Sequence, residues 1–214
     1  MPPRKLQSVL SEFSSRMRES RRLANYAREW SLHKGKSGRP FISGKRRDSI
    51  IELAFLRAFL AWEAFLEKSF LLYLAGKVPP RGRLPKRYYF PPSHKMAMDW
   101  LAEGRDYAKW ADAGEVGKRA ARFFQDGHPF TSVLRSNQTA LADANIIRNM
   151  IAHESSNTRQ KFEKIARREL STLPINRTAG AFLGTTVPTS SPPVSFLESY
   201  VSKLESCAKQ IIPL

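Results

Sequence analysis

Cysteine is nearly absent from this 214-residue chain, which has only Cys207. A single cysteine excludes an intramolecular disulfide and any cysteine-based zinc cluster, and it is typical of a reducing compartment, so we expect a cytoplasmic protein. Acidic residues are also few, because 19 Asp and Glu stand against 36 Lys and Arg for a formal net charge of +17. This imbalance indicates a polyanionic partner, nucleic acid or an anionic membrane surface. A basic protein with no specific ligand is the alternative.

Long hydrophobic runs and cofactor motifs are absent too. Charged side chains interrupt the most apolar stretch, residues 50–75, which argues against a membrane span. The basic residues are spread over loops rather than along one amphipathic face, so a membrane-surface protein has the least support. No apolar run follows the basic N-terminus, so we expect no signal peptide. There is no Walker-type glycine loop, dinucleotide fingerprint or HExxH motif, and we therefore expect neither a cofactor nor a bound metal.

Apolar residues recur at three- and four-residue steps through most of the chain, which predicts an all-α protein, and no stretch alternates enough to predict a strand. Helices are expected at residues 4–33, 49–75, 95–112, 115–125, 138–154, 158–171 and 195–212. Segments rich in glycine, proline and serine predict loops at 34–48, 76–95 and 172–194. We interpret residues 1–214 as one helical domain with its core at about 5–172, elaborated by the loop at 172–194 and a C-terminal helix.

The helix predicted at 49–75 is apolar on almost all sides, which is typical of a central bundle helix or a dimerisation helix. Ser49 and Glu52 have capping-box spacing at its start. Glu63 lies in its most apolar part, residues 61–65, and a buried carboxylate needs a partner. Arg148 is a candidate for that partner; alternatively, Glu63 lies on the wet edge of the bundle.

The helix predicted at 138–154 has one apolar stripe, formed by Leu141, Ala144, Ile147 and Ile151. Arg148, Asn149 and His153 lie off this stripe, near the helix end. Asn149 and His153 share a face, whereas roughly 140° of rotation and about 7.5 Å of rise separate Arg148 from His153. Arg148 and His153 can therefore serve one site only if the helix ends or bends near His153, or if a second chain completes the site.

Arginine and histidine together suit cleavage of a phosphodiester without metal. The guanidinium of Arg148 is a permanent cation that grips phosphate oxygens and stabilises developing charge. The imidazole of His153 can give and take protons near neutral pH. The alternative is an arginine and a histidine that interact with the last carbonyls of a helix.

The run Arg148-Asn149-Met150-Ile151-Ala152-His153 resembles the R-N-x-x-x-H signature of the HEPN superfamily, and Ala61-Trp62-Glu63-Ala64-Phe65 is similar to the central helix of that superfamily. The resemblance implies a HEPN-type helical bundle and a metal-independent endoribonuclease of a prokaryotic toxin–antitoxin or phage-defence system. It implies a composite active site in a homodimer, with catalytic roles for Arg148 and His153 and with Asn149 and Glu63 setting their geometry. An antitoxin protein is a further expected partner.

One position departs from the family pattern. HEPN toxins that a nucleotidyltransferase silences usually have tyrosine two residues after the motif histidine, where this chain has Ser155. Inactivation by AMP transfer to such a tyrosine is therefore in doubt.

The loop predicted at 76–95 has a composition typical of single-strand binding, because basic residues contact phosphates and aromatic rings stack on unpaired bases. Its candidate RNA-binding residues are Arg81, Arg83, Lys86, Arg87, Tyr88 and Tyr89. An equally plausible role for the aromatic residues is to pin this long loop to the core. His94 and His128 are rival acid–base candidates, which we interpret as loop histidines.

Two functions from different classes follow. The first is an endoribonuclease in which the RNA 2′-hydroxyl attacks the adjacent phosphate and leaves a 2′,3′-cyclic phosphate. The second is a non-catalytic RNA- or DNA-binding regulatory module, in which Arg148 only contacts phosphate. Both predict salt-dependent binding, and only the first predicts new RNA ends.

Overall fold

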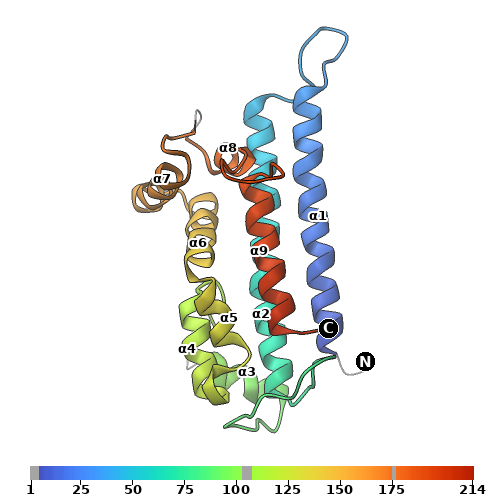
Figure 1. Cartoon of the computed structure of the whole chain (residues 1–214), viewed down its shortest axis with the longest axis vertical. Coiled ribbons are helices and arrows are strands. Elements are labelled where there is room, and N and C mark those ends of the chain that lie inside the picture. The colour runs from blue at the N-terminus through green and yellow to red at the C-terminus, as the bar shows by residue number, and fades with distance from the viewer. Residues whose placement is uncertain (1–4, 103–107, 175–176) are drawn as a thin grey trace. The chain divides into compact units, whose positions relative to one another are not determined.

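The computed structural model describes residues 5–102, 108–174 and 177–214, and every regular element within them is a helix (Figure 1). The helices are α1 (Leu6–Leu32), α2 (Gly44–Leu74), α3 (His94–Ala102), α4 (Ala113–Phe123), the 3₁₀ turn η1 (Gln125–Gly127), α5 (Phe130–Ser136), α6 (Gln138–Ala152), α7 (Ser156–Leu170), α8 (Ala179–Gly184) and α9 (Phe196–Ile211). The predicted all-α fold is thus confirmed. None of the described helices has an apolar stretch long enough to cross a membrane.

The start of α2 differs from the prediction. The helix begins at Gly44, five residues before the expected start, and the hydroxyl of Ser49 donates a hydrogen bond to the carbonyl of Lys45 at 3.2 Å inside the helix. The predicted capping box of Ser49 and Glu52 is therefore wrong. Lys45, Arg46 and Arg47, which we assigned to a loop, are good helix formers and make up the first turn after Gly44.

Other boundaries differ as well. Of the helix predicted at 95–112, the structure shows His94–Ala102, and residues 103–107 lie outside the described residues. Residues 108–110 are not helical. The loop predicted at 172–194 contains the short helix α8, where the hydroxyl of Thr178 accepts a hydrogen bond from the N–H of Ala181. Short elements such as α5 and α8 have too few turns to produce a readable apolar period.

The described residues form two compact units. The first contains the described residues within 1–15, 61–142 and 204–214, and the second contains those within 16–60 and 143–203. Helices α1, α2, α6 and α9 contribute residues to both units. Each unit is described below by itself.

Phe70 of α2 is the centre of an aromatic cluster in the first unit. Its ring centroid lies 4.9 Å from that of Phe124, 5.0 Å from Phe130 and 5.5 Å from Trp110. One turn later, the buried hydroxyl of Tyr73 donates a hydrogen bond to the carbonyl of Ile211 at 2.7 Å, which ties α2 to the end of α9. These contacts bury large aromatic surfaces, and the burial of apolar surface is the main contribution to the stability of a helical bundle.

The second unit is organised around aromatic rings of α7, α8 and α9. Phe182 of α8 stacks on Phe196 with centroids 4.3 Å apart, and Phe162 of α7 meets Phe182 edge-on at 5.7 Å. On the surface of the same unit, the guanidinium of Arg21 donates two hydrogen bonds to the carboxylate of Glu198, at 2.8 and 2.9 Å. The ring contacts of Phe182 hold α8 against Phe162 and Phe196. They thereby also position residues 177 and 178, which directly precede α8.

Gly180 allows α8 to approach α2 closely. A Cβ atom at this position would lie 2.1 Å from the backbone oxygen of Asp48, far inside any real contact distance. The N–H of Gly180 also donates a hydrogen bond to Oε1 of Glu52 at 2.9 Å. No residue with a side chain fits here without moving one of the two helices.

We predict that Gly180→Ala lowers the free energy of unfolding by about 1–3 kcal/mol, because the added methyl group overpacks the contact with α2. The matched control is Gly117→Ala in α4, where an added Cβ meets nothing within 4 Å. That substitution should raise stability by about 0.5–1 kcal/mol through the lower entropy of the unfolded chain. Urea unfolding of both variants checks this pair, and a neutral Gly180→Ala would contradict the described packing.

Candidate active site at the end of α6

Helix α6 carries the R-N-x-x-x-H motif and ends directly before its histidine. The expected apolar stripe is buried at Leu141, Ala144 and Ile147, and it is half-buried at Ile151. The last residue of the helix is Ala152, and the N–H of His153 still donates to the carbonyl of Asn149 at 2.9 Å. The helix therefore ends near His153, which is one of the two conditions stated above for Arg148 and His153 to serve one site; the other is a second chain that completes the site.

The side chain of Asn149 links two neighbours on α6. Its Oδ1 accepts a hydrogen bond from Nη1 of Arg148 at 3.0 Å, and its Nδ2 donates to Oδ1 of Asn145 at 3.3 Å. Arg148, Asn149 and Asn145 are all half-buried. This chain of hydrogen bonds restricts the rotamers of Arg148.

The turn after α6 is held by Thr158. Its hydroxyl donates to the carbonyl of His153 at 2.9 Å and accepts from the N–H of Ser155 at 2.9 Å. The hydroxyl of Ser155 accepts in return from the N–H of Thr158, which completes a capping box at the start of α7. Glu154 and Arg159 form an ion pair across the same turn. The backbone of His153 is therefore fixed at both sides.

The imidazole of His153 is exposed, and it makes no hydrogen bond or ion pair with any residue that the structure describes. A catalytic histidine is usually oriented by a hydrogen bond to its second nitrogen. In a single copy of this chain, the described residues do not supply one. An RNA substrate or a second protomer must do so if His153 transfers protons.

Glu63, the fourth predicted catalytic residue, is half-buried, and its chain neighbours Trp62 and Phe65 are buried. It belongs to the first unit, whereas Arg148, Asn149 and His153 belong to the second. Its pairing with Arg148 stays a prediction.

The predicted RNA-binding loop lies in the first unit, where its backbone is anchored on both sides. The N–H of Tyr88 donates to the carbonyl of Phe123 at 2.9 Å, and the carbonyl of Lys86 accepts from the N–H of Gln125 at 2.9 Å. Arg81, Arg83 and Lys86 are exposed. The loop thus presents these three cations from a fixed backbone.

Arg87 is engaged within the protein. Its Nη1 donates to the carbonyl of Leu74 at 2.7 Å, at the C-terminus of α2, and its guanidinium lies 4.7 Å above the ring centroid of Phe90. Cations near a helix C-terminus satisfy free carbonyls and complement the helix dipole. A structural role thus accounts for Arg87, and its RNA contact stays a prediction.

The aromatic residues of the loop divide between the two roles considered from the sequence. The ring of Tyr89 packs against Phe123 at 5.5 Å and against Trp100 at 6.2 Å, which pins the loop to the first unit. Tyr88 is 56% exposed and its ring makes no aromatic contact with the described residues, so it is available for stacking on an unpaired base. Phe90 is 67% exposed, but the guanidinium of Arg87 covers one face of its ring.

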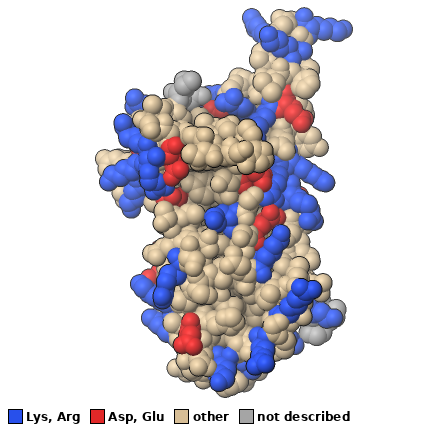
Figure 2. Space-filling view, viewed as in Figure 1, with Lys and Arg blue, Asp and Glu red and all other residues tan. Residues whose placement is uncertain are grey.

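Helix α7 presents a basic face next to the motif in the second unit. Lys161, Lys164 and Arg167 are exposed, lie within roughly 120° of one another, and form no ion pair with the described residues. Arg168 differs, because Asp143 and Glu169 both pair with it. Figure 2 shows Lys and Arg side chains gathered over α7. The sequence predicts a helix at 158–171, and the structure adds that these three cations share one face.

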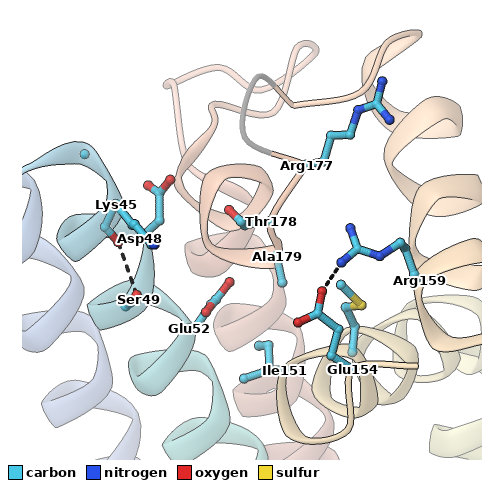
Figure 3. Close-up of a pocket in the computed structure, with 12 residues that line it drawn as sticks. Lys45, Asp48, Ser49, Glu52, Ile151, Glu154, Arg159, Arg177, Thr178 and Ala179 are labelled. Carbon is cyan, nitrogen blue, oxygen red and sulfur yellow. Dashed lines mark hydrogen bonds and ion pairs between the residues drawn. The ribbon is translucent and has the colours of Figure 1, made fainter. Parts of the chain in front are cut away.

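A cavity of about 700 Å³ in the second unit was not foreseen from the sequence (Figure 3). Its walls come from the first turns of α2, the end of α6, the start of α7 and residues 177–179. Met150 and Ile151 of the R-N-x-x-x-H run line it, as does Glu154. Since these segments are distant along the chain, no local pattern could reveal the cavity. Among the described residues, no group of three or more His, Cys, Asp or Glu side chains could hold a metal ion.

Comparisons with known proteins found no relatives: no family model, no curated protein and no solved structure matches this chain.

We predict that Arg87→Ala destabilises the protein by about 1–2 kcal/mol, since it removes a charged hydrogen bond that caps α2. Arg83→Ala is the matched control, because Arg83 is exposed in the same loop. It should leave the melting temperature unchanged. Thermal unfolding of both variants measures the difference, and equal melting temperatures would show that the cap contributes no stability.

Proposed function

We propose that this protein is a metal-independent endoribonuclease of the HEPN type. The observation that carries the proposal is the end of α6, where Asn149 accepts a hydrogen bond from Arg148 and the helix stops directly before the exposed His153. The resemblance of the motif supports the same function, and an all-helical chain with a net charge of +17 is compatible with it. A role in a toxin–antitoxin or phage-defence system, with an antitoxin as partner, rests on that resemblance alone.

The proposed reaction needs no water and no metal. The 2′-oxygen of the RNA forms a bond to the adjacent phosphorus, and the bond from phosphorus to the 5′-oxygen breaks, which leaves a 2′,3′-cyclic phosphate and a 5′-hydroxyl. His153 takes the proton from the 2′-hydroxyl, and a second acid gives a proton to the departing 5′-oxygen. The guanidinium of Arg148 binds the non-bridging oxygens as negative charge accumulates on them.

A homodimer supplies the second acid most simply. Two R-N-x-x-x-H helix ends that face each other place the partner's His153 on the other side of the scissile phosphate. The exposed and unsupported imidazole of His153 is compatible with such a composite site. In this arrangement, Asn149 and Glu63 set the position of Arg148 and do not touch the RNA.

RNA binding in the second unit is assigned to the basic face of α7, defined by Lys161, Lys164 and Arg167. The turn of residues 153–155 joins this face to the motif, so a strand bound along α7 can reach His153. In the first unit, Arg81, Arg83 and Lys86 bind phosphates, while Tyr88 stacks on a base.

We predict that His153→Ala abolishes cleavage of single-stranded RNA in EDTA, because no other group takes the 2′-hydroxyl proton. The loss should be at least about 10²-fold, the usual contribution of one general base. His94→Ala is the matched control, since His94 is an exposed histidine outside the motif. It should cleave at the wild-type rate. If purified His153→Ala cleaves as fast as wild type, the assignment is wrong.

A second prediction concerns the basic face of α7. Replacing Lys161, Lys164 and Arg167 together by Gln in the His153→Ala background should weaken RNA binding and lower the slope of log K against log salt by about 2, at about 0.7 per lost phosphate contact. The control replaces Lys34, Lys36 and Arg39, which are also exposed, so the change in net charge is equal. If the two triple variants show equal slopes, the basic face of α7 does not contact the RNA.

The alternative function is a non-catalytic nucleic-acid-binding module. The exposed cations of α7 and of the loop at 76–95 serve this function as well as the first. Under this alternative, wild type binds RNA with the same salt dependence as His153→Ala, and neither protein produces new RNA ends.

A further inference from the structure

The cavity of the second unit is lined by one face of α2 that changes chemistry along its length (Figure 3). Lys45, Ser49 and Glu52 follow one another at steps of four and three residues, so they share this face. From Lys45 to Glu52 the helix rises by roughly 10 Å. A cation, a hydroxyl and a carboxylate are thus spaced over about the length of a mononucleotide, from its phosphate to the far edge of its base.

Glu52 supplies the carboxylate end. Its side chain extends from α2 toward the middle of the cavity (Figure 3). Oε1 accepts the N–H of Gly180 at 2.9 Å, and Oε2 makes no hydrogen bond with any described residue. Burial raises the pKa of the Glu52 carboxyl, as does the nearby charge of Asp48, while the Gly180 N–H opposes the rise. A half-buried carboxylate with one uncommitted oxygen gains from N–H donors on a ligand.

The opposite end suits an anion. Lys45 lines this end, is exposed, and forms no ion pair with the described residues. Gly44 and Lys45 also lie in the first turn of a 31-residue helix, where backbone N–H groups lack intrahelical acceptors. Phosphate oxygens satisfy both the Lys45 cation and these N–H groups. Arg177 lines the cavity from the other side, and its guanidinium points away from it (Figure 3).

The remaining walls are mostly apolar or bear hydroxyl groups, apart from Asp48, which pairs with Arg47, and the ion pair of Glu154 and Arg159. Met150, Ile151 and Ala179 present apolar surface, and Thr178 and Ser49 present hydroxyl oxygens. Arg159 also lines the cavity, but Glu154 already pairs with it. A ligand with a flat apolar ring, hydroxyl groups and an anionic end matches these walls.

We propose that this cavity binds a guanine nucleotide, with its phosphate at Lys45 and the first turn of α2 and the Watson–Crick edge of its base at Glu52. Guanine presents two adjacent N–H donors on that edge, N1–H and the N2 amine, which a carboxylate accepts together. Adenine and cytosine place a ring-nitrogen acceptor beside their amine, and uracil flanks its single N–H with two carbonyls. Each of these three bases turns an acceptor toward the carboxylate oxygens.

The position of the cavity relates the nucleotide to the proposed nuclease. Met150 and Ile151 are two of the three residues between Asn149 and His153, so the ligand contacts the motif helix itself. Arg148, Asn149 and His153 do not line the cavity. A guanosine bound there is thus not the nucleotide that is cleaved. It is either another residue of the RNA, which rests on the proposed function, or a free guanine nucleotide that binds as an effector.

The recognition of guanine is common to both possible ligands, and direct binding of free nucleotides tests it without any cleavage. Calorimetry of the wild-type chain in EDTA is run with GMP, IMP, AMP, CMP and UMP. GMP should bind at least about tenfold more tightly than AMP, CMP and UMP, and IMP, which keeps N1–H and lacks the N2 amine, should lie between them. Equal affinity for all five nucleotides, or no binding of any, overturns the proposal.

Two variants locate the ligand. Glu52→Gln keeps an oxygen for the Gly180 N–H and loses the charge, so it should fold and lose the preference for GMP over AMP. Lys45→Gln should weaken all five nucleotides by a similar factor. Glu154→Gln is the control, because this carboxylate lines the same cavity but is paired. It should keep the preference. A Glu52→Gln protein that still prefers GMP contradicts the assignment, and if this variant does not fold, the IMP comparison on wild type decides.

RNA oligomers distinguish the two sources. On the His153→Ala background, an oligouridine with one G and the same oligomer with inosine are compared with free GMP. Tighter binding of the G oligomer, with competition by GMP, identifies a guanosine of the RNA. Binding of GMP without any effect of G in the oligomer identifies a free nucleotide. Either result supports the pocket, and neither depends on whether His153 is catalytic.

Discussion

The close approach of α8 to α2 at Gly180 is the constraint on which the second unit depends. Only a glycine lets the backbone of α8 reach the Asp48 carbonyl, and the same residue donates its N–H to Glu52. From this anchor, Phe182 reaches the rings of Phe162 and Phe196 and so packs against α7 and α9. The contact also places residues 177–179 at the wall of the cavity, next to the end of α6. One steric requirement thus links the packing of the unit to its candidate sites.

The excess of basic residues is used in two different ways. Some cations serve the fold: Arg87 caps α2, Arg21 binds Glu198, and Arg168 binds Asp143. Others, such as those of the basic face of α7, have no counter-charge among the described residues and stay exposed. Only this second group raises the local potential that attracts a polyanion. The net charge therefore overstates how many basic residues are available to RNA.

The sequence was informative where long periodic patterns decide the structure. The all-α class, the extents of α1, α6 and α9, and the buried stripe of α6 all follow from apolar spacing. The end of α6 next to His153 was foreseen as one of two geometric conditions. The early start of α2, the helix α8 and the cavity were not, since they depend on tertiary contacts such as the approach at Gly180. The role of Arg87 as a cap was hidden for the same reason, because its acceptor lies 13 residues earlier in the chain.

The central claim is that the RNA itself supplies the nucleophile while Arg148 and His153 assist. The most direct test is to identify the ends of the products formed by wild-type protein in EDTA, from an RNA and from the same RNA with a 2′-O-methyl group at every ribose. The account predicts 2′,3′-cyclic phosphate and 5′-hydroxyl ends from the first RNA, and binding without cleavage of the second. Cleavage of the methylated RNA, or products with 5′-phosphate ends, would contradict it.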